Sequence, residues 1–302
     1  MSDINVDTDW AFTQYESIRK VLPAAKFPAG SKHIANLSEV ADRFDVFLLD
    51  AFGVLNVGET PIPGAPEQVA ALQAMGKRVM VLTNGASLPA ERSMEKYRLF
   101  GFDLKRADVI SSRDILMASL EKQSPTVWGC MALSTSKLEE FSAQVLALGD
   151  DPQLYNDVGG FILLGSAGWT SARQALMVNS LIAIPRPILV GNPDLVAPRE
   201  TDLSLEPGWF GHHAAHETGI SPQFFGKPFD AIFAEARKRV PADIPNDRIA
   251  MVGDTLHTDI LGGKAAGFGT VLIAEHGLFR GKNVASYIKA SGIIPDFIAP
   301  TT

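Results

Sequence analysis

Residues 45–53 read DVFLLDAFG, four apolar residues followed by a single carboxylate at Asp50. A short unbroken apolar run predicts a strand that is buried on both faces, as in the middle of a parallel sheet. Asp50 then lies at the carboxyl end of that strand, beside the crevice in which open α/β sheets bind ligands. The alternative interpretation of Asp50 is an aspartate that only caps a loop.

Strand and helix patterns alternate on both sides of this stretch. Residues 66–75 have apolar side chains at helical spacing, and residues 79–82 form a second apolar run with Thr83 and Asn84 at its end. The alternation predicts further helices at 89–100, 112–120, 137–148, 171–184, 229–239, 259–266 and 284–290, and strands at 126–133, 161–164, 187–190, 249–252 and 270–274. The sequence therefore predicts an α/β protein, with a Rossmann-like parallel sheet and helices on both faces.

The polar residues that are candidates for catalysis or binding stop at Asn84 and resume near Asn192. This gap predicts an inserted α/β unit at 90–189, within a core made of 37–89 and 190–302. Residues 1–36 are interpreted as an N-terminal extension with a short helix at 9–21. After the insert, residues 198–207 are expected to be a polar loop and residues 211–218 a short helix.

Composition excludes several classes of function. The chain has 302 residues, 46% of them hydrophobic and 20% charged, which is ordinary for a globular protein. Its formal net charge of −7 argues against nucleic acids and anionic membranes as partners. The single cysteine, Cys130, lies in an apolar run and is expected to be a core residue. No secretory signal and no membrane-spanning run is recognised, which predicts a cytoplasmic protein.

Four features recur at the predicted strand ends of the core. They are Asp50, the turn Thr83-Asn84-Gly85, Lys227, and Asp254 with Asp259 in the stretch GDTLHTD. A carboxylate can act as a nucleophile on phosphorus, and Mg²⁺ prefers hard oxygen ligands such as Asp50 and Asp254. A threonine hydroxyl and turn N–H groups can hold phosphate oxygens, and a lysine can neutralise them. As a set, these residues predict a phosphoryl-transfer site, although each alone has a structural explanation.

The order DxxGVL, VLTNG, GKP and VGDxxxTDIxxG resembles the haloacid dehalogenase superfamily. The insert between the Thr83 and Lys227 motifs resembles the branch with an α/β cap at that place, which includes phosphoglycolate, pyridoxal-phosphate and nitrophenyl-phosphate phosphatases. The resemblance implies that Asp50 is the nucleophile and a metal ligand and that Lys227 fixes the phosphate. It also implies that Thr83, Asn84 and Gly85 bind phosphate, and it matches Asn192 to a recurring turn near the cap. Asp254 would bind Mg²⁺, with Asp259 supporting the metal shell.

One position departs from this pattern. The family's phosphatases usually carry a second aspartate two residues after the nucleophile, which protonates the leaving oxygen and then activates water. Here the residue is Phe52, whose backbone carbonyl can still be a metal ligand but whose ring has no exchangeable proton. Losing a general acid–base typically lowers the rate by about 10² to 10⁴. His212, His213, His216 or His257 is considered as a replacement, since histidine titrates near neutral pH.

The resulting interpretation is a Mg²⁺-dependent phosphatase of small phosphorylated metabolites such as sugar phosphates, with the cap selecting the substrate. Trp128 and Trp169 are aromatic candidates for the substrate pocket, with buried packing as the alternative. Two other functions stay open: a non-catalytic phosphate-ligand binding protein, and a hydrolase of a non-phosphate bond, as dehalogenases are. The resembling branch also makes a homodimer possible.

Overall fold

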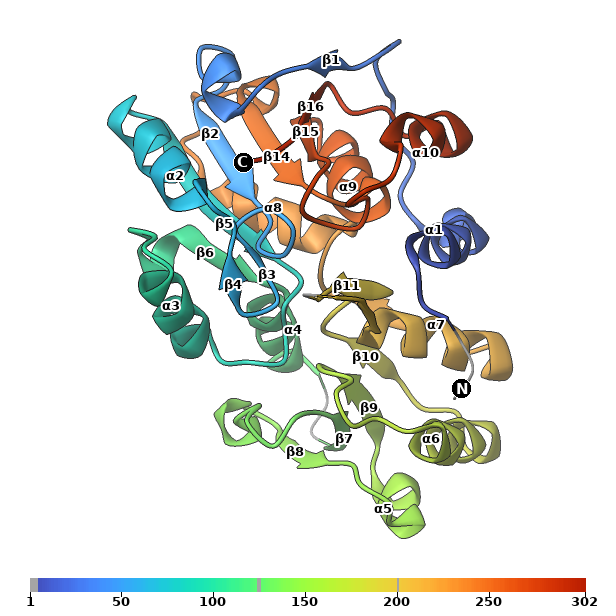
Figure 1. Ribbon diagram of the computed structural model, residues 1–302. Helices are drawn as coiled ribbons and strands as arrows, with labels where there is room; N and C mark the ends of the chain where they lie inside the picture. The colour runs from blue at the N-terminus through green and yellow to red at the C-terminus, as the bar shows by residue number, and fades with distance from the viewer. Residues whose placement is uncertain (1–4, 124–125, 200) are drawn as a thin grey trace.

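The computed structural model describes residues 5–123, 126–199 and 201–302, and its larger sheet has seven parallel strands (Figure 1). The order across the sheet is β1-β16-β15-β14-β2-β5-β6. The bounds are Lys32–His33 (β1), Val46–Leu49 (β2), Arg78–Thr83 (β5), Val109–Ser111 (β6), Ile249–Gly253 (β14), Gly269–Ile273 (β15) and Phe297–Ala299 (β16). The chain runs outward from β2 in one direction through β5 and β6, and in the other through β14 to β16. Such a reversal of strand order places a crevice beside β2.

Strand β2 is buried on both faces, as its apolar run predicts. Phe47 and Leu49 pack into one core, and Val46 and Leu48 into the core on the opposite face. Helix α2 (Ala65–Ala74) covers the first face, and helix α8 (Asp230–Arg239) covers the second. The predicted α/β class with helices on both faces is confirmed.

A second sheet lies below the first in Figure 1 and has five parallel strands in the order β13-β10-β9-β7-β8. Its strands are Val127–Met131 (β7), Gln144–Ala147 (β8), Gly160–Leu163 (β9), Ile188–Val190 (β10) and Gln223–Phe224 (β13). Helices α6 (Ser171–Ala183) and α7 (Pro207–Thr218) pack against each other on one face. The opposite face buries Trp128 and Cys130.

Two short hairpins and several further helices complete the described residues. The hairpins are β3 with β4 (Asn56–Val57, Thr60–Pro61) and β11 with β12 (Val196–Pro198, Leu203–Leu205). The α-helices are α1 (Thr8–Ser17), α3 (Ala90–Leu99), α4 (Ser112–Leu120), α5 (Pro152–Asp157), α9 (Leu261–Ala265) and α10 (Val284–Ser291). The single-turn 3₁₀ segments are Arg19–Val21, Leu37–Val40, Arg106–Asp108, Leu138–Glu140 and Asn246–Arg248, and Leu256–Ile260 is a π-helix.

The prediction of a helix at 137–148 is wrong. Phe141, Val145 and Leu148 have helical spacing, yet residues 138–140 form only a 3₁₀ turn and Gln144–Ala147 is the edge strand β8. Pairing with β7, and packing of Phe141 and Leu148 on opposite faces of the second sheet, override the local pattern. The loop expected at 198–207 is also wrong in part, because it contains β12 and the start of α7 at Pro207.

The two sheets divide the chain differently from the predicted insert at 90–189. Strand β6, at 109–111, pairs with β5 in the larger sheet, so the segment 90–111 returns to the core before the second sheet begins. Strand β13, at 223–224, still belongs to the second sheet. In the N-terminal segment, β1 joins the edge of the larger sheet, and Ala11 and Tyr15 of α1 are buried against it.

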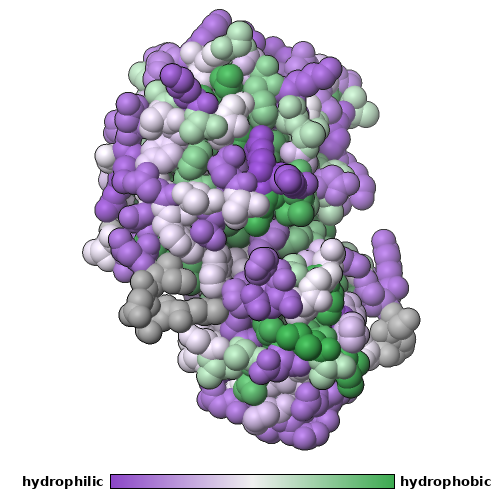
Figure 2. All heavy atoms as spheres, turned by 90° about the vertical axis from the view of Figure 1, so that its right-hand side faces the viewer, coloured by the Kyte–Doolittle hydropathy of each residue, from purple (hydrophilic) through white to green (hydrophobic). Residues whose placement is uncertain are grey.

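Figure 2 shows hydrophilic side chains over much of the face it presents, with hydrophobic side chains gathered above and below the place where the outline narrows. Within the described ranges, no helix is long and apolar enough to cross a membrane.

Candidate active site

Three neighbouring strands bring polar residues to one edge of the larger sheet. Asp50 follows β2, Thr83 ends β5, and Asp254 follows β14. The backbone N–H of Asp50 donates to the carbonyl of Val252 at 2.8 Å, which ties the aspartate to the neighbouring strand. Gly53 has φ +76°, and a Cβ there would lie 2.6 Å from Cγ of Asp254. Glycine at this position therefore lets the loop after β2 approach the second carboxylate.

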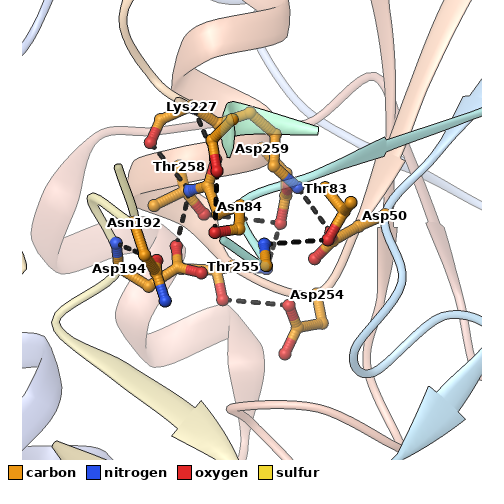
Figure 3. Close-up of polar contacts among 12 residues, drawn as sticks. Asp50, Thr83, Asn84, Asn192, Asp194, Lys227, Asp254, Thr255, Thr258 and Asp259 are labelled. Carbon is orange, nitrogen blue, oxygen red and sulfur yellow. Dashed lines mark hydrogen bonds and ion pairs between the residues drawn. The ribbon is translucent and has the colours of Figure 1, made fainter. Parts of the chain in front are cut away.

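Lys227 connects two of the carboxylates (Figure 3). Its Nζ lies 2.6 Å from Oδ1 of Asp50 and 2.7 Å from Oδ1 of Asp259. The side chain is only 1% exposed, so the ammonium group interacts with both carboxylates in a poorly solvated region. Burial alone would lower the pKa of Lys227, but Asp259, Asp50 and Asp194 raise it above its ordinary value. The lysine therefore stays charged at physiological pH.

Asn84 holds the backbone of Lys227 in place. Its Oδ1 accepts from the N–H of Lys227 at 2.7 Å, and its Nδ2 donates to the carbonyl of Lys227 at 2.9 Å and to Oδ1 of Asp194 at 2.8 Å. Both amide hydrogens are thus engaged inside the protein. The side chain of Asn84 positions the lysine, and the groups at this turn that remain for a phosphate are the Thr83 hydroxyl and backbone N–H groups. Oγ1 of Thr83 accepts from the N–H of Gly85 at 3.0 Å.

Asp254 and Asp259 are fixed by several donors. Oδ2 of Asp254 accepts from the N–H of Leu278 at 2.7 Å, and its Oδ1 accepts from the hydroxyl of Thr255 at 3.0 Å. Asp259 is fully buried, and its Oδ2 accepts from the N–H of Thr255 at 3.1 Å. Asp259 lies in the π-helix Leu256–Ile260, so its carboxylate points back toward the strand end.

Negative charge exceeds positive charge in this cluster. Asp50, Asp194 and Asp259 surround the single ammonium of Lys227, and Asp254 lies close to Asp50 and Asp259. Burial, and then repulsion from Asp259, raises the pKa of Asp50 to about 7, although the attraction of Lys227 opposes this shift. Burial, with repulsion from Asp259 and Asp50, raises the pKa of Asp254 to about 8. Burial also raises the pKa of Asp194 well above its ordinary value. Buried carboxylates crowded in this way are stabilised by a cation.

The donor set fits a divalent metal ion with hard-ligand preference. Oxygens of Asp50, Asp254 and Asp259 all lie within 4.8 Å of one another. Carboxylate oxygens are the ligands that Mg²⁺ and Ca²⁺ prefer. The geometry is therefore compatible with a divalent metal among these three residues.

Two adjoining cavities reach the cluster. The larger, of about 790 Å³, lies within the size range of small-molecule sites and is lined by Phe52, Thr83 and Gly85 on the core side and by Trp169 on the side of the second sheet. The smaller, of about 20 Å³, shares Phe52, Thr83 and Gly85 and adds Asp50 and Asp254. Trp169 thus lines the larger cavity, whereas Trp128 is only 2% exposed and packs in the core of the second sheet.

The histidines considered as replacement acids lie elsewhere. Among the described residues that line these two cavities there is no histidine. His212 stacks on Phe224 with a ring separation of 4.7 Å, and burial lowers its pKa to about 4. His213 contacts Gln174, and His216 on the same helix is exposed. His257 is buried against α1, with Nε2 2.6 Å from Oε1 of Glu16.

The side chain of Asn192 makes hydrogen bonds within and beyond its own turn. Oδ1 of Asn192 accepts from the N–H of Asp194 at 3.0 Å, and its Nδ2 donates to Oε2 of Glu206 at 3.1 Å. The turn thereby delivers Asp194 to Asn84, as Figure 3 shows. Asp194 and Glu206 were not among the sequence candidates. Asp194 lies in the turn of Asn192, which the sequence analysis had singled out, whereas nothing in the sequence around Glu206 indicates a site.

Two family models match the chain. Haloacid dehalogenase-like hydrolase matches residues 47–152, and HAD-hydrolase-like matches residues 224–301. Together these matches cover more than half of the chain.

Individual relatives agree with these matches. The chain is 25% identical over 285 residues, 86% of its length, to a 4-nitrophenylphosphatase of Schizosaccharomyces pombe, of which 92% is covered. It is 24% identical to an acid sugar phosphatase of Staphylococcus aureus, over 76% of this chain and 86% of that protein. A crystal structure of a possible sugar phosphatase from Cytophaga hutchinsonii superposes with a TM-score of 0.77 and 26% identity, covering 90% of this chain and 98% of that one.

Proposed function

The chain belongs to the haloacid dehalogenase-like hydrolases, and we propose that it is a Mg²⁺-dependent phosphatase of small phosphorylated metabolites. The observation that carries the proposal is the position of Lys227 between Asp50 and Asp259. Asp50 also lines the small cavity, which shares Phe52, Thr83 and Gly85 with the 790 Å³ cavity. The names of the relatives, a nitrophenyl phosphatase and sugar phosphatases, support a phosphate ester as substrate.

In this proposal Asp50 is the nucleophile. Its carboxylate oxygen attacks phosphorus and forms an aspartyl-phosphate, which water later hydrolyses. Lys227 neutralises charge on the phosphate and on Asp50, and it is held in position by Asn84. The Thr83 hydroxyl, whose oxygen accepts from the N–H of Gly85, donates to a phosphate oxygen, and other backbone N–H groups of this turn assist it.

Mg²⁺ would be held by Asp50 and Asp254, with Asp259 and the backbone carbonyl of Phe52 as supporting groups. When bound, it supplies positive charge to the phosphate oxygens. The excess of buried carboxylates over ammonium groups supports a divalent ion at this place. The second sheet with α6 and α7 is proposed as the cap, because Trp169 from that side faces the larger cavity.

The test is hydrolysis of 4-nitrophenyl phosphate with Mg²⁺ and with a chelator. A phosphatase loses turnover when the metal is removed and regains it when Mg²⁺ is added back. Turnover of a halogenated acid that persists in the chelator would instead identify a dehalogenase-like hydrolase. Phe52 favours a second candidate, a phosphate-ligand binding protein, which would bind phosphate or Mg²⁺ but hydrolyse no ester.

The charge cluster also predicts how stability depends on pH. The pKa values of Asp50 and Asp254 in the folded state, about 7 and about 8, lie above their ordinary value of 3.8. Their contribution to stability is therefore complete below the unfolded-state value and is lost as the pH rises through 7 and 8. We expect the Tm of the metal-free protein to be lower at about pH 8.5 than at about pH 6.

Mg²⁺ should raise the Tm more at the higher pH, because the metal binds the deprotonated carboxylates. Thermal unfolding in a chelator and in excess Mg²⁺, at both pH values, measures this difference. Asp254→Asn is the matched control and should reduce both the pH dependence and the Mg²⁺ effect. A metal-free Tm that rises with pH over this range would contradict the prediction.

A further inference from the structure

Phe52 stands at the mouth of the site with two cationic side chains beside its ring. Nζ of Lys96, on α3, lies 5.1 Å from the ring centroid, and the guanidinium carbon of Arg199, in the β11–β12 hairpin, lies 5.6 Å from it. All three residues line the larger cavity, which also includes the turn residues Thr83 and Gly85. The cations therefore lie on the side of the site that receives the rest of the substrate.

Both cations are held in place by the protein. Nζ of Lys96 donates to the carbonyl of Gly58 at 3.0 Å and to Oε1 of Glu59 at 2.9 Å. Arg199 donates to Oε1 of Glu206 at 2.7 Å. The carboxylate of Glu206 is in turn fixed by Ser204 at 2.6 Å and by Asn192 at 3.1 Å.

Among the described residues of the same wall, the carboxyl groups are already engaged with cations. Glu206 accepts hydrogen bonds from Arg199, Ser204 and Asn192, and three donors favour its carboxylate form, although burial raises its pKa. The side chain of Glu59 is 79% exposed and is paired with Lys96. Burial raises the pKa of Tyr97, another residue of the cavity wall. The wall thus offers positive charge to a departing group more readily than it offers a proton.

We propose that this site selects phosphorylated compounds whose leaving group departs as an anion, namely a phenolate, enolate, carboxylate or phosphate, rather than an alcohol. The inference rests on the proposed phosphatase function and names its substrate class. An oxygen lone pair of Asp50 forms the new O–P bond. The bond from phosphorus to the leaving oxygen breaks, and that oxygen keeps the electron pair.

The leaving oxygen takes up no proton in this step. Lys96 and Arg199, which are shared with Glu59 and Glu206, offset part of its charge. The same arrangement disfavours alkyl phosphates, because an alkoxide is too basic to leave without a proton. Phe52 contributes an apolar ring against which both cations lie.

The test is a series of aryl phosphates graded by the acidity of the phenol, together with one alkyl phosphate, assayed with Mg²⁺. For the native protein, kcat/KM should fall steeply as the leaving group becomes more basic. In Phe52→Asp the dependence should be shallow, and the gain on the alkyl phosphate should be about 10² to 10⁴-fold. Arg199→Gln and Lys96→Gln should each lower kcat/KM for the aryl phosphates by about tenfold. This is less than the loss of a fully buried donor would cause, because both residues are partly solvated.

Arg92→Gln is the matched control, since Arg92 lies one turn before Lys96 on α3 and its side chain is 67% exposed. It should leave every rate unchanged. A shallow dependence on leaving-group basicity in the native protein would overturn the inference while leaving the phosphatase function intact. If that dependence then became steep in Glu206→Gln, Glu206 would be identified as the proton donor. Unaltered rates in both cation variants would overturn it as well. Failure of the native protein to hydrolyse any ester would remove the phosphatase function itself.

Discussion

Replacement of Asp50 by asparagine should abolish metal-dependent turnover of 4-nitrophenyl phosphate, lowering kcat by about 10⁴-fold or more. Asparagine has nearly the same shape, but its amide cannot form the covalent phosphoryl intermediate. The substitution also removes one of the charges that balance Lys227. Steady-state rates with Mg²⁺, compared with the native protein, measure the effect.

The loss should be chemical rather than structural. Lys227 keeps its second partner, Asp259, at 2.7 Å. The substitution also removes the repulsion between the carboxylates of Asp50 and Asp254. The metal-free Tm of Asp50→Asn should therefore not fall below that of the native protein. Asp45→Asn is the matched control at the other end of the same strand, where Asp45 forms a surface ion pair with Arg248. Such a pair contributes about 0 to 1 kcal/mol, so turnover should be retained. Full activity in Asp50→Asn would disprove the nucleophilic role.

The positions of Asp50, Thr83 and Asp254 were predictable because parallel strands end at a common edge. Each residue follows an apolar run, and β14, β2 and β5 are adjacent in the sheet. The sequence order alone therefore brings these side chains together, whatever the details of the intervening chain. Lys227 was grouped with these residues as a strand-end residue, but the strand that it follows, β13, belongs to the second sheet and not to the larger one.

Contacts between residues distant in sequence were not predictable. Asn84 interacts with Lys227, 143 positions away, and this contact was not indicated by the sequence around either residue. Lys96 lies on a helix and Arg199 in a hairpin, and the local sequence pattern does not indicate that either of them is close to Phe52. The edge strand β8 was missed for a related reason, since pairing with β7 decides its conformation.

Phe52→Asp should change the second half of the reaction even when the leaving group needs no acid. Hydrolysis of an aspartyl-phosphate requires a base that takes a proton from the attacking water, and the ring of Phe52 has no such group. The native protein should therefore release one equivalent of 4-nitrophenolate in a burst and then turn over slowly. In Phe52→Asp the burst should disappear, and the steady-state rate should rise by about 10² to 10⁴-fold.

The cavity wall can accept the new carboxylate, because Lys96 and Arg199 already lie 5.1 and 5.6 Å from the centre of the ring. These cations would stabilise its carboxylate form, which suits a base in the second step. Because Lys96 and Arg199 are already paired with Glu59 and Glu206, the new carboxyl can still carry the proton that it donates in the first step. Phe52→Leu separates chemistry from shape, since leucine also lacks a base and should show the burst without the gain. Rapid-mixing measurements of product release, with acid-quenched protein assayed for bound phosphate, follow both steps. Fast steady-state turnover without a burst in the native protein would mean that another group activates the water, and the small cavity shared by Asp50, Asp194 and Thr258 would be the place to seek it.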